Sequence, residues 1–491
     1  MGADIPDISN DEVTETQVLQ SQATQLDLAI RGGTIVTASD EFRADIGIRD
    51  GRIVAIADGI EGAPREIDAS GLLALPGGID SHVHISQAQG PDVVMADDFA
   101  SATRAAAAGG NTMVLPFALQ EKGTSLRTCV ENYRKLAEGE CYIDTAFHLI
   151  ISDPTAVVLG QELPALVKDG YTSFKVFMTY DDLVLNDKQL LEVFDVARRE
   201  EALVMVHCEG YDAIRFLTSK LEREGHIAPY YHGVSRPQAV EREATHRAIS
   251  HAEVIGVPIM IVHVSGREAM EQIRWAQQRG LPVHAETCPQ YITLTADDMK
   301  GLNMDISGAK YVCSPPPRDV ENQQAIWEGI TTGVFQTFSS DHCPFRYDDP
   351  KGKLTPNART SFRWVPNGIP GVETRLPILF SEGVSKGRIT LQKFVELTAT
   401  NHARIYGLYP RKGSIGVGFD ADIVLWDPKL TKPIRQADLH HGSDYTPWEG
   451  FDVTGWPVTT IARGRVVYEQ GKIVGNKGAG EVLSRGKSSL V

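Results

Sequence analysis

Cysteine is scarce in this sequence, and the few cysteines are scattered. The six cysteines among 491 residues form no Cys-x-x-Cys pair, so neither a disulfide framework nor a structural zinc knot is indicated. Isolated cysteines are typical of reduced, buried thiols, and we expect a cytoplasmic protein. They are Cys129, Cys141, Cys208, Cys288, Cys313 and Cys343.

Long apolar runs and clusters of basic residues are also missing. No stretch approaches the roughly 18 uninterrupted apolar residues of a membrane span, and the polar N-terminus lacks the apolar core of a signal peptide. The formal net charge is −16, with no Lys/Arg-rich stripe to offset it, which argues against nucleic acid and anionic membranes as partners. We expect residues 1–25 to be a disordered N-terminal extension.

Short β-rich segments occur near both ends of the chain. Residues 26–75 alternate apolar and polar side chains, with Gly-Gly and Asp-Gly at the turns. The same pattern returns over residues 412–475. Because the two ends of a domain often lie close together, we expect both segments to form one small β-sandwich domain, followed by a C-terminal tail at 476–491.

The interior, residues 76–411, alternates apolar strand-like runs with stretches of helical periodicity that often end in glycine. Eight strands with helical crossovers predict an α/β fold, namely a (β/α)₈ TIM barrel with insertions. The alternative is an open doubly wound sheet, but no glycine-rich phosphate motif follows the first strand. The strands are predicted at residues 73–84, 112–118, 143–152, 173–178, 203–209, 258–265, 281–288 and 335–343.

Histidines and an aspartate stand at the carboxyl ends of predicted strands, where a barrel enzyme carries its active groups. His82 and His84 are two residues apart on the first strand, so both rings point to one side and can bind one metal. The fifth, sixth and eighth strands end near His207, His263 and Asp341. Such ligands suit Zn²⁺, with Fe, Co, Ni or Mn as substitutes, whereas a single histidine more often belongs to a hydrogen-bonded core.

Lys175 lies in the fourth predicted strand, between Phe174 and Val176. Apolar surroundings lower the pKa of a lysine by desolvation and leave a neutral, nucleophilic amine. Such an amine can take up CO₂ to become N6-carboxylysine, a negative ligand able to bridge two cations about 3.5–4 Å apart. A lysine that extends to the barrel rim is the alternative that the sequence leaves open.

Seven motifs follow one another along the chain: GGIDSHVH, SFKVFMTYDDLVLND, VMVHCEG, IVHVSG, KYVCSPPPRD, SSDHCPF and PNGIPGVETR. In this order they resemble the motif series of the dihydropyrimidinase/hydantoinase family of cyclic amidohydrolases, from about Leu26 to Gly475. The resemblance implies hydrolysis of the ring amide C–N bond of a cyclic ureide or imide, such as a dihydropyrimidine or a 5-substituted hydantoin. The product would be an N-carbamoyl amino acid or an open half-amide, and the chain would form a homotetramer or homodimer.

The resemblance also implies two divalent metal ions held by six side chains. The more buried metal would be held by His82, His84, carboxylated Lys175 and Asp341. The second metal would be held by the same bridging Lys175, His207 and His263.

Three further roles follow from the resemblance. Asp341 would take the proton of the metal-bridging hydroxide that attacks the carbonyl and pass it to the leaving nitrogen. Tyr180 matches the tyrosine that donates a hydrogen bond to the tetrahedral oxyanion. Ser314 and Asn367 match positions whose backbone groups hold the cyclic amide or ureide.

Residues 85–90 depart from the family pattern. They read ISQAQG, where hydantoinases continue with an apolar loop, and this stretch is closer to allantoinase. Ser86 replaces the substrate-pairing arginine of dihydroorotase, which argues against that activity. The alternatives are an allantoinase-like or imidase hydrolase and a non-catalytic oligomeric scaffold, although all six ligand positions are present.

Overall fold

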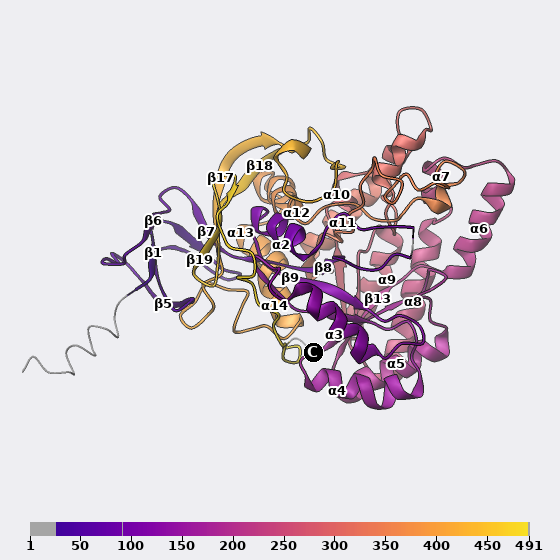
Figure 1. Cartoon of the computed structure of the whole chain (residues 1–491), viewed down its shortest axis with the longest axis horizontal. Coiled ribbons are helices and arrows are strands. Elements are labelled where there is room, and N and C mark those ends of the chain that lie inside the picture. The colour runs from indigo at the N-terminus through magenta and orange to yellow at the C-terminus, as the bar shows by residue number, and fades with distance from the viewer. Residues whose placement is uncertain (1–25, 91, 490–491) are drawn as a thin grey trace, which may run out of the picture.

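The computed structural model describes residues 26–90 and 92–489 (Figure 1). The predicted extension at residues 1–25 lies outside this part of the chain. Two β-sheets stand at one end of the molecule, and a barrel surrounded by helices forms the other end (Figure 1). Among the described helices, none combines the length and the apolar character needed to cross a membrane.

The barrel confirms the predicted fold class. Within the described residues, eight parallel strands pair in chain order from β8 to β16, and a bridge between Val83 and His342 joins the last segment to the first. β10 (Asp144–Thr145) is a short addition beside β9. The barrel strands are β8 (Gly78–Val83), β9 (Asn111–Leu119), β11 (His148–Ile150), β12 (Ser173–Phe177), β13 (Leu203–His207), β14 (Ile259–Ile261), β15 (Val283–Thr287) and β16 (Thr337–Phe338).

Helices connect successive barrel strands, and their ends follow local sequence signals. Asn186 caps α5 by accepting a hydrogen bond from the backbone N–H of Gln189 at 3.0 Å. Gly256 and Gly333 end their helices with φ of 74° and 82°, which a glycine adopts without strain. The helices are α2 (Phe99–Ala108), α3 (Leu126–Ala137), α4 (Leu163–Lys168), α5 (Asp187–Glu200), α6 (Tyr211–Arg223), α7 (Tyr230–Val234), α8 (Gln238–Ile255), α9 (Arg267–Gln278), α10 (Gln290–Thr293), α11 (Val320–Thr332), α12 (Arg375–Leu379), α13 (Leu391–Val395) and α14 (Asn401–Ile405).

Single π-helical or 3₁₀ turns extend several of these helices and connections. The π-helical turns are Val158–Glu162, Phe380–Ser385 and Glu396–Thr400. The 3₁₀ turns are Ala296–Lys300, Ile306–Tyr311, Phe362–Trp364 and Gln436–Asp438.

The two ends of the chain share one seven-stranded sheet, as the sequence predicts. Its order is β20-β19-β18-β17-β7-β2-β3, and the C-terminal β17 pairs antiparallel with the N-terminal β7 (Figure 1). The second sheet, β5-β4-β1-β6, comes from the N-terminal segment alone. Side chains of both sheets, including Ile48 and Ile423, share one apolar cluster. The strands are β1 (Leu28–Arg31), β2 (Thr34–Val36), β3 (Glu41–Arg43), β4 (Asp45–Arg49), β5 (Arg52–Ala57), β6 (Glu66–Asp68), β7 (Leu73–Pro76), β17 (Ile423–Pro433), β18 (Asp452–Ala462), β19 (Arg465–Glu469) and β20 (Lys472–Ile473).

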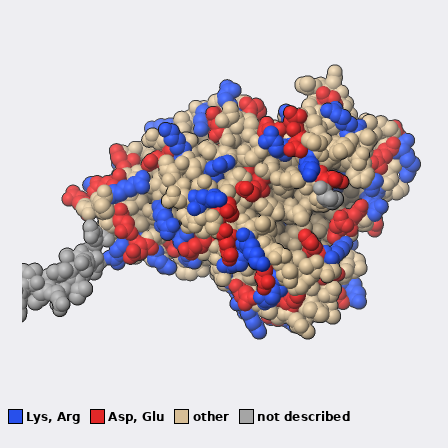
Figure 2. All heavy atoms as spheres, in the orientation of Figure 1, with Lys and Arg blue, Asp and Glu red and all other residues tan. Residues whose placement is uncertain are grey.

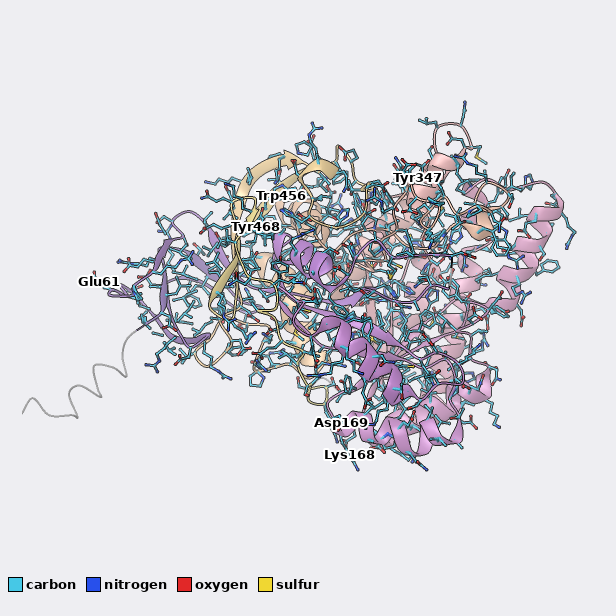
Figure 3. All side chains as sticks on the ribbon, viewed as in Figure 1. Glu61, Lys168, Asp169, Tyr347, Trp456 and Tyr468 are labelled. Atoms are coloured by element: carbon cyan, nitrogen blue, oxygen red, sulfur yellow. The ribbon has the colours of Figure 1, made fainter. Side chains whose placement is uncertain are left out.

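Labelled side chains in Figure 3 show where the two sheets lie relative to the barrel. Trp456 and Tyr468 lie on the seven-stranded sheet, and Glu61 lies at the tip of the β5–β6 connection, far from the barrel (Figure 3). On the face drawn in Figure 2, basic and acidic side chains are interspersed over both parts. This face therefore shows no basic stripe, in agreement with the sequence.

The C-terminal segment packs against the amino-terminal end of the barrel. The backbone N–H of Leu483 donates to the carbonyl of Thr145 at 2.7 Å. Arg485 is buried and donates to the carbonyl of Phe147 at 2.6 Å and to the hydroxyl of Ser173 at 2.8 Å. Because these contacts cover the strand beginnings, the barrel opens at its carboxyl end.

Candidate metal centre

One cavity of about 770 Å³ lies at the carboxyl ends of the barrel strands. Its lining includes every side chain that the sequence proposes as a metal, catalytic or substrate-binding group. These are His82, His84, Lys175, Tyr180, His207, His263, Ser314, Asp341 and Asn367. All barrel strands run in the same direction, so residues near their carboxyl ends meet at one end of the barrel. The alternation of side chains along each strand directs these residues toward the barrel interior.

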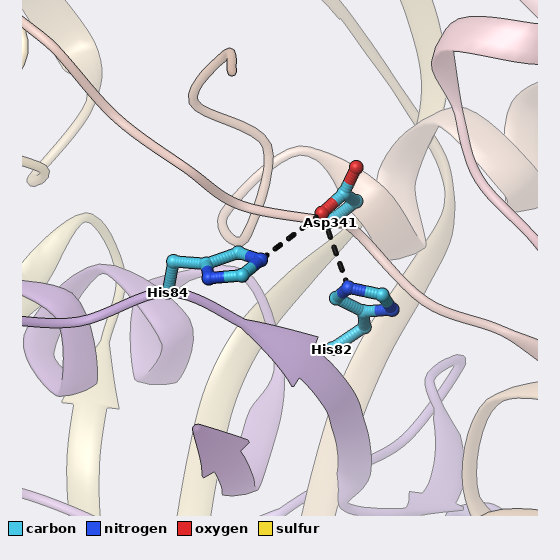
Figure 4. Close-up of side chains that lie close together, drawn as sticks. All are labelled: His82, His84 and Asp341. Carbon is cyan, nitrogen blue, oxygen red and sulfur yellow. Dashed lines mark ion pairs between the residues drawn. The ribbon is translucent and has the colours of Figure 1, made fainter. Parts of the chain in front are cut away.

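Three of these side chains face one another directly at the end of β8 (Figure 4). The Oδ1 atom of Asp341 lies 3.3 Å from His82 Nε2 and 3.6 Å from His84 Nε2. Figure 4 also shows the second carboxylate oxygen directed away from both rings. One donor atom from each residue falls within 4.8 Å of the other two, a spacing that one metal ion can span.

Lys175 extends from β12 into the same group. Its Nζ atom lies 3.4 Å from His82 Nε2 and 5.1 Å from the ring centroids of Phe117 and Phe177. Burial lowers the pKa of the Lys175 amine, and the Asp341 carboxylate opposes this shift only in part. The lysine is only 1% exposed, so the structure contradicts the alternative of a side chain at the rim.

His207 and His263 form the other side of the centre. Their ring centroids lie 4.3 Å apart, and the His263 ring lies 5.2 Å from that of His82. Both ring nitrogens of His263 are buried without a hydrogen-bond partner among the described residues. Burial and the neighbouring His207 lower the pKa of His263, which keeps its ring neutral. An imidazole without hydrogen bonds is costly in a protein interior, so this donor set fits a divalent metal centre.

Two buried glutamates, which the sequence analysis missed, orient the imidazoles. His82 Nδ1 lies 2.6 Å from Glu286 Oε1, which leaves Nε2 to face the centre. His207 Nε2 lies 2.7 Å from Glu209 Oε2, which leaves Nδ1 of His207 to face the centre. Burial raises the pKa of Glu209, but the Arg236 charge and the His207 hydrogen bond outweigh it and hold that pKa at about 2. Carboxylates behind metal-binding imidazoles are a common support, and the two-residue spacing of His207 and Glu209 was a signal for one of them.

The backbone around the centre is strained at three functional positions. Tyr180, His263 and Asp341 have φ of 71°, 41° and 51°, in the left-handed region that side chains other than glycine rarely adopt. Such conformations cost about 1–3 kcal/mol each and gather at active sites. The fold therefore holds these three side chains in positions that an isolated strand end would not select.

Tyr180 lines the cavity beside His207. Its ring centroid is 5.4 Å from that of His207. Burial raises the pKa of Tyr180 to about 12, so the hydroxyl stays protonated near neutral pH and can donate a hydrogen bond. Nearby, Ser314 Oγ lies 3.2 Å from the buried His232, a cavity residue that the sequence analysis also missed.

A second acidic cluster, Asp144, Asp420 and Asp422, also has the spacing of a metal site. The ammonium of Lys412 already occupies its centre, at 2.8, 3.1 and 2.6 Å from the three carboxylates. This cluster is therefore a buried ion network between the barrel and the β-sheets, and not a metal site.

Gln87 is the third support of the centre and differs from the other two in charge. Its Oε1 atom lies 2.6 Å from His84 Nδ1, so a neutral amide stands where His82 and His207 have carboxylates. We expect that His84 in Gln87→Met no longer prefers one tautomer and that zinc binding weakens about tenfold. This is the lower end of the effect on metal affinity when a hydrogen-bonding support of a ligand is lost. Gln87→Glu should bind at least as tightly as the wild type.

Chelator competition with the purified variants measures this effect. Gln89→Met, at an exposed position two residues later, is the matched control. An unchanged zinc affinity in Gln87→Met would show that His84 does not depend on the amide.

Comparisons with known proteins agree with this site. A model of the amidohydrolase family matches residues 73–467. A D-hydantoinase of Ralstonia pickettii is 44% identical over 463 residues, covering 94% of this chain and 99% of that protein. A solved D-hydantoinase structure has a TM-score of 0.91 at 44% identity, covering 94% of this chain and 99% of that one. A dihydropyrimidinase structure from Brevibacillus agri has a TM-score of 0.90 at 41% identity, with the same coverage. The chain belongs to the amidohydrolase family, in its hydantoinase and dihydropyrimidinase branch.

Proposed function

We propose that this protein hydrolyses the ring amide C–N bond of cyclic ureides or imides, such as dihydropyrimidines and 5-substituted hydantoins. The products are N-carbamoyl amino acids or open half-amides. The observation that carries the proposal is the convergence of six metal-type donors and a protonated tyrosine in one cavity. The similarity to D-hydantoinases and a dihydropyrimidinase supports this class of substrate.

The proposed metal centre holds two divalent ions, with zinc as the first candidate. One ion would be held by His82, His84, Lys175 and Asp341, and the other by Lys175, His207 and His263. Lys175 would bridge both as N6-carboxylysine, which its buried, desolvated amine supports. When bound, such a metal pair supplies a Lewis acid and lowers the pKa of water toward 7.

Asp341 is the proposed proton carrier. It accepts the proton of the attacking water and delivers it to the ring nitrogen as the C–N bond breaks, so one carboxylate acts first as base and then as acid. Its two oxygens suit this double use, because one faces the two histidines while the other points away from them (Figure 4).

Tyr180, Ser314 and Asn367 are the proposed substrate contacts. The Tyr180 hydroxyl donates a hydrogen bond to the oxygen that becomes negative when water adds to the carbonyl. Backbone groups of Ser314 and Asn367 hold the ring amide in place. All three residues line the same cavity, which supports a single bound ring.

Turnover of dihydrouracil, hydantoin and allantoin by the zinc-loaded protein tests the proposal. We expect ring opening of dihydrouracil or hydantoin, and loss of this activity after dialysis against a chelator. Cleavage of allantoin alone would assign the chain to the allantoinase alternative. A chain that binds no divalent metal and opens none of the rings would instead fit the scaffold alternative.

We further propose that residues 76–411 act as the catalytic barrel and that residues 26–75 and 412–475 act as a supporting β-sandwich domain. A homotetramer or homodimer in the cytoplasm stays our prediction for the assembled protein. Free thiols at all six cysteines support a reducing compartment.

A further inference from the structure

Arg236 is a buried cation beside the metal centre that the proposed chemistry does not use. It lies between α7 and α8, lines the cavity and is 7% exposed. A guanidinium so far from bulk water requires compensating partners. The nature of those partners indicates why it is there.

The first partner leads to a metal-ligand candidate. Arg236 Nη1 donates to Glu209 Oε2 at 2.9 Å, and the same oxygen lies 2.7 Å from His207 Nε2. Arg236 therefore fixes the position of the Glu209 carboxylate, and this carboxylate orients the imidazole of His207. Removing the guanidinium leaves Glu209 buried without a cationic partner and free to turn away from His207.

The second partner leads to the proposed oxyanion donor. The guanidinium carbon lies 5.7 Å from the ring centroid of Tyr180, within the range of a cation–π contact. Tyr180 has a left-handed backbone conformation, so its position depends on what packs against it. A planar guanidinium over the ring restricts the direction of the hydroxyl.

The backbone of Arg236 is itself anchored. Arg318 donates a hydrogen bond to the Arg236 carbonyl and a second one, at 2.9 Å, to Glu241 on α8. The Arg236 side chain thus extends from a fixed point toward both partners.

We propose that Arg236 is a positioning residue that couples the His207 side of the metal centre to Tyr180. One side chain then sets both the imidazole nitrogen offered to the metal and the direction of the hydroxyl offered to the substrate. The coupling to catalysis rests on the proposed function, whereas the coupling to His207 concerns metal binding alone.

Two substitutions separate the two contacts. Arg236→Met removes both, and we expect about 10–100-fold weaker zinc binding together with a lower kcat. Arg236→Lys keeps a point charge for Glu209 but not the planar group over Tyr180, so it should restore zinc affinity more fully than kcat. Arg242→Met is the matched control, because Arg242 on α8 forms an exposed ion pair with Glu268 on α9 at 2.7 Å, and it should change neither quantity.

Double variants test whether the effects pass through the named partners. Chelator competition on Glu209→Gln should show no further loss of zinc affinity when Arg236→Met is added. The kcat loss caused by Arg236→Met should shrink when Tyr180→Phe is already present. Wild-type zinc affinity in Arg236→Met, or kcat losses that simply add to those of Tyr180→Phe, would overturn the proposal.

If Arg236→Met does not fold, Arg236→Lys still tests the two contacts. Equal values of zinc affinity and kcat, each relative to the wild type, in Arg236→Lys would contradict separate contacts of Arg236 with Glu209 and with Tyr180. A wild-type protein that binds zinc but opens no cyclic ureide would refute the proposed function, while the zinc measurements would still test the link from Arg236 to His207.

Discussion

Replacing Lys175 by alanine is expected to remove metal binding and, with it, activity. The Lys175 amine lies 3.4 Å from His82 Nε2 in the interior of the barrel. Among the described residues, the other lysine that lines the cavity is Lys122, which is exposed. Without this side chain, two ions would lose their common ligand and repel each other across the centre. We expect kcat to fall by about 10³-fold or more, the scale of losing a group that stabilises transition-state charge.

Metal analysis and kinetics on Lys175→Ala check this expectation. Added short carboxylic acids should restore part of both, because their carboxylate can occupy the space of the proposed carbamate. Lys168→Ala is the control, because Lys168 is exposed at the end of α4 (Figure 3) and does not line the cavity. Full metal content in Lys175→Ala would refute the bridging role.

Replacing Asp341 by asparagine is expected to have the second-largest effect. Asparagine preserves the shape of the side chain but cannot accept and return a proton, so we expect kcat to fall about 10²–10⁴-fold. Measurement of kcat at saturating zinc separates this loss from any loss of metal, since Asp341 also faces His82 and His84.

Asp169→Asn is the matched control for this substitution. Asp169 (Figure 3) forms an exposed ion pair with Arg127 at 2.9 Å, and neither residue lines the cavity. Such exposed pairs contribute little to stability. A zinc-loaded Asp341→Asn protein with wild-type kcat would contradict the role of proton carrier.

Much of the fold could be predicted because strand and helix periodicities are local properties. Seven of the eight barrel strands lie within their predicted ranges, and β9 extends one residue beyond its range at each end. The third strand is shorter than predicted, since it comprises only His148–Ile150. The shared sheet of the two chain ends was also predicted from alternation. The pairing partners themselves, such as β7 with β17, required the folded chain because they lie more than 300 residues apart.

The supporting groups of the centre could not be predicted with the same success. Glu286 lies on β15 and contacts His82, which lies on β8. No sequence pattern in either segment indicates this contact. Arg236 lies in a turn between two helices, where a charged residue is usually an exposed one. Their roles depend on distances between elements, which a linear pattern does not contain.

By itself, the sequence determined which side chains reach the carboxyl end of the barrel, because each strand alternates its faces with a period of two. It also determined the chemistry of those side chains. Only the tertiary structure decided which nitrogen of His82, His84 and His207 faces the centre, since the other nitrogen contacts Glu286, Gln87 and Glu209, respectively. The physical reason is that an imidazole has two nearly equivalent nitrogens, and a hydrogen bond from a neighbouring group selects between them.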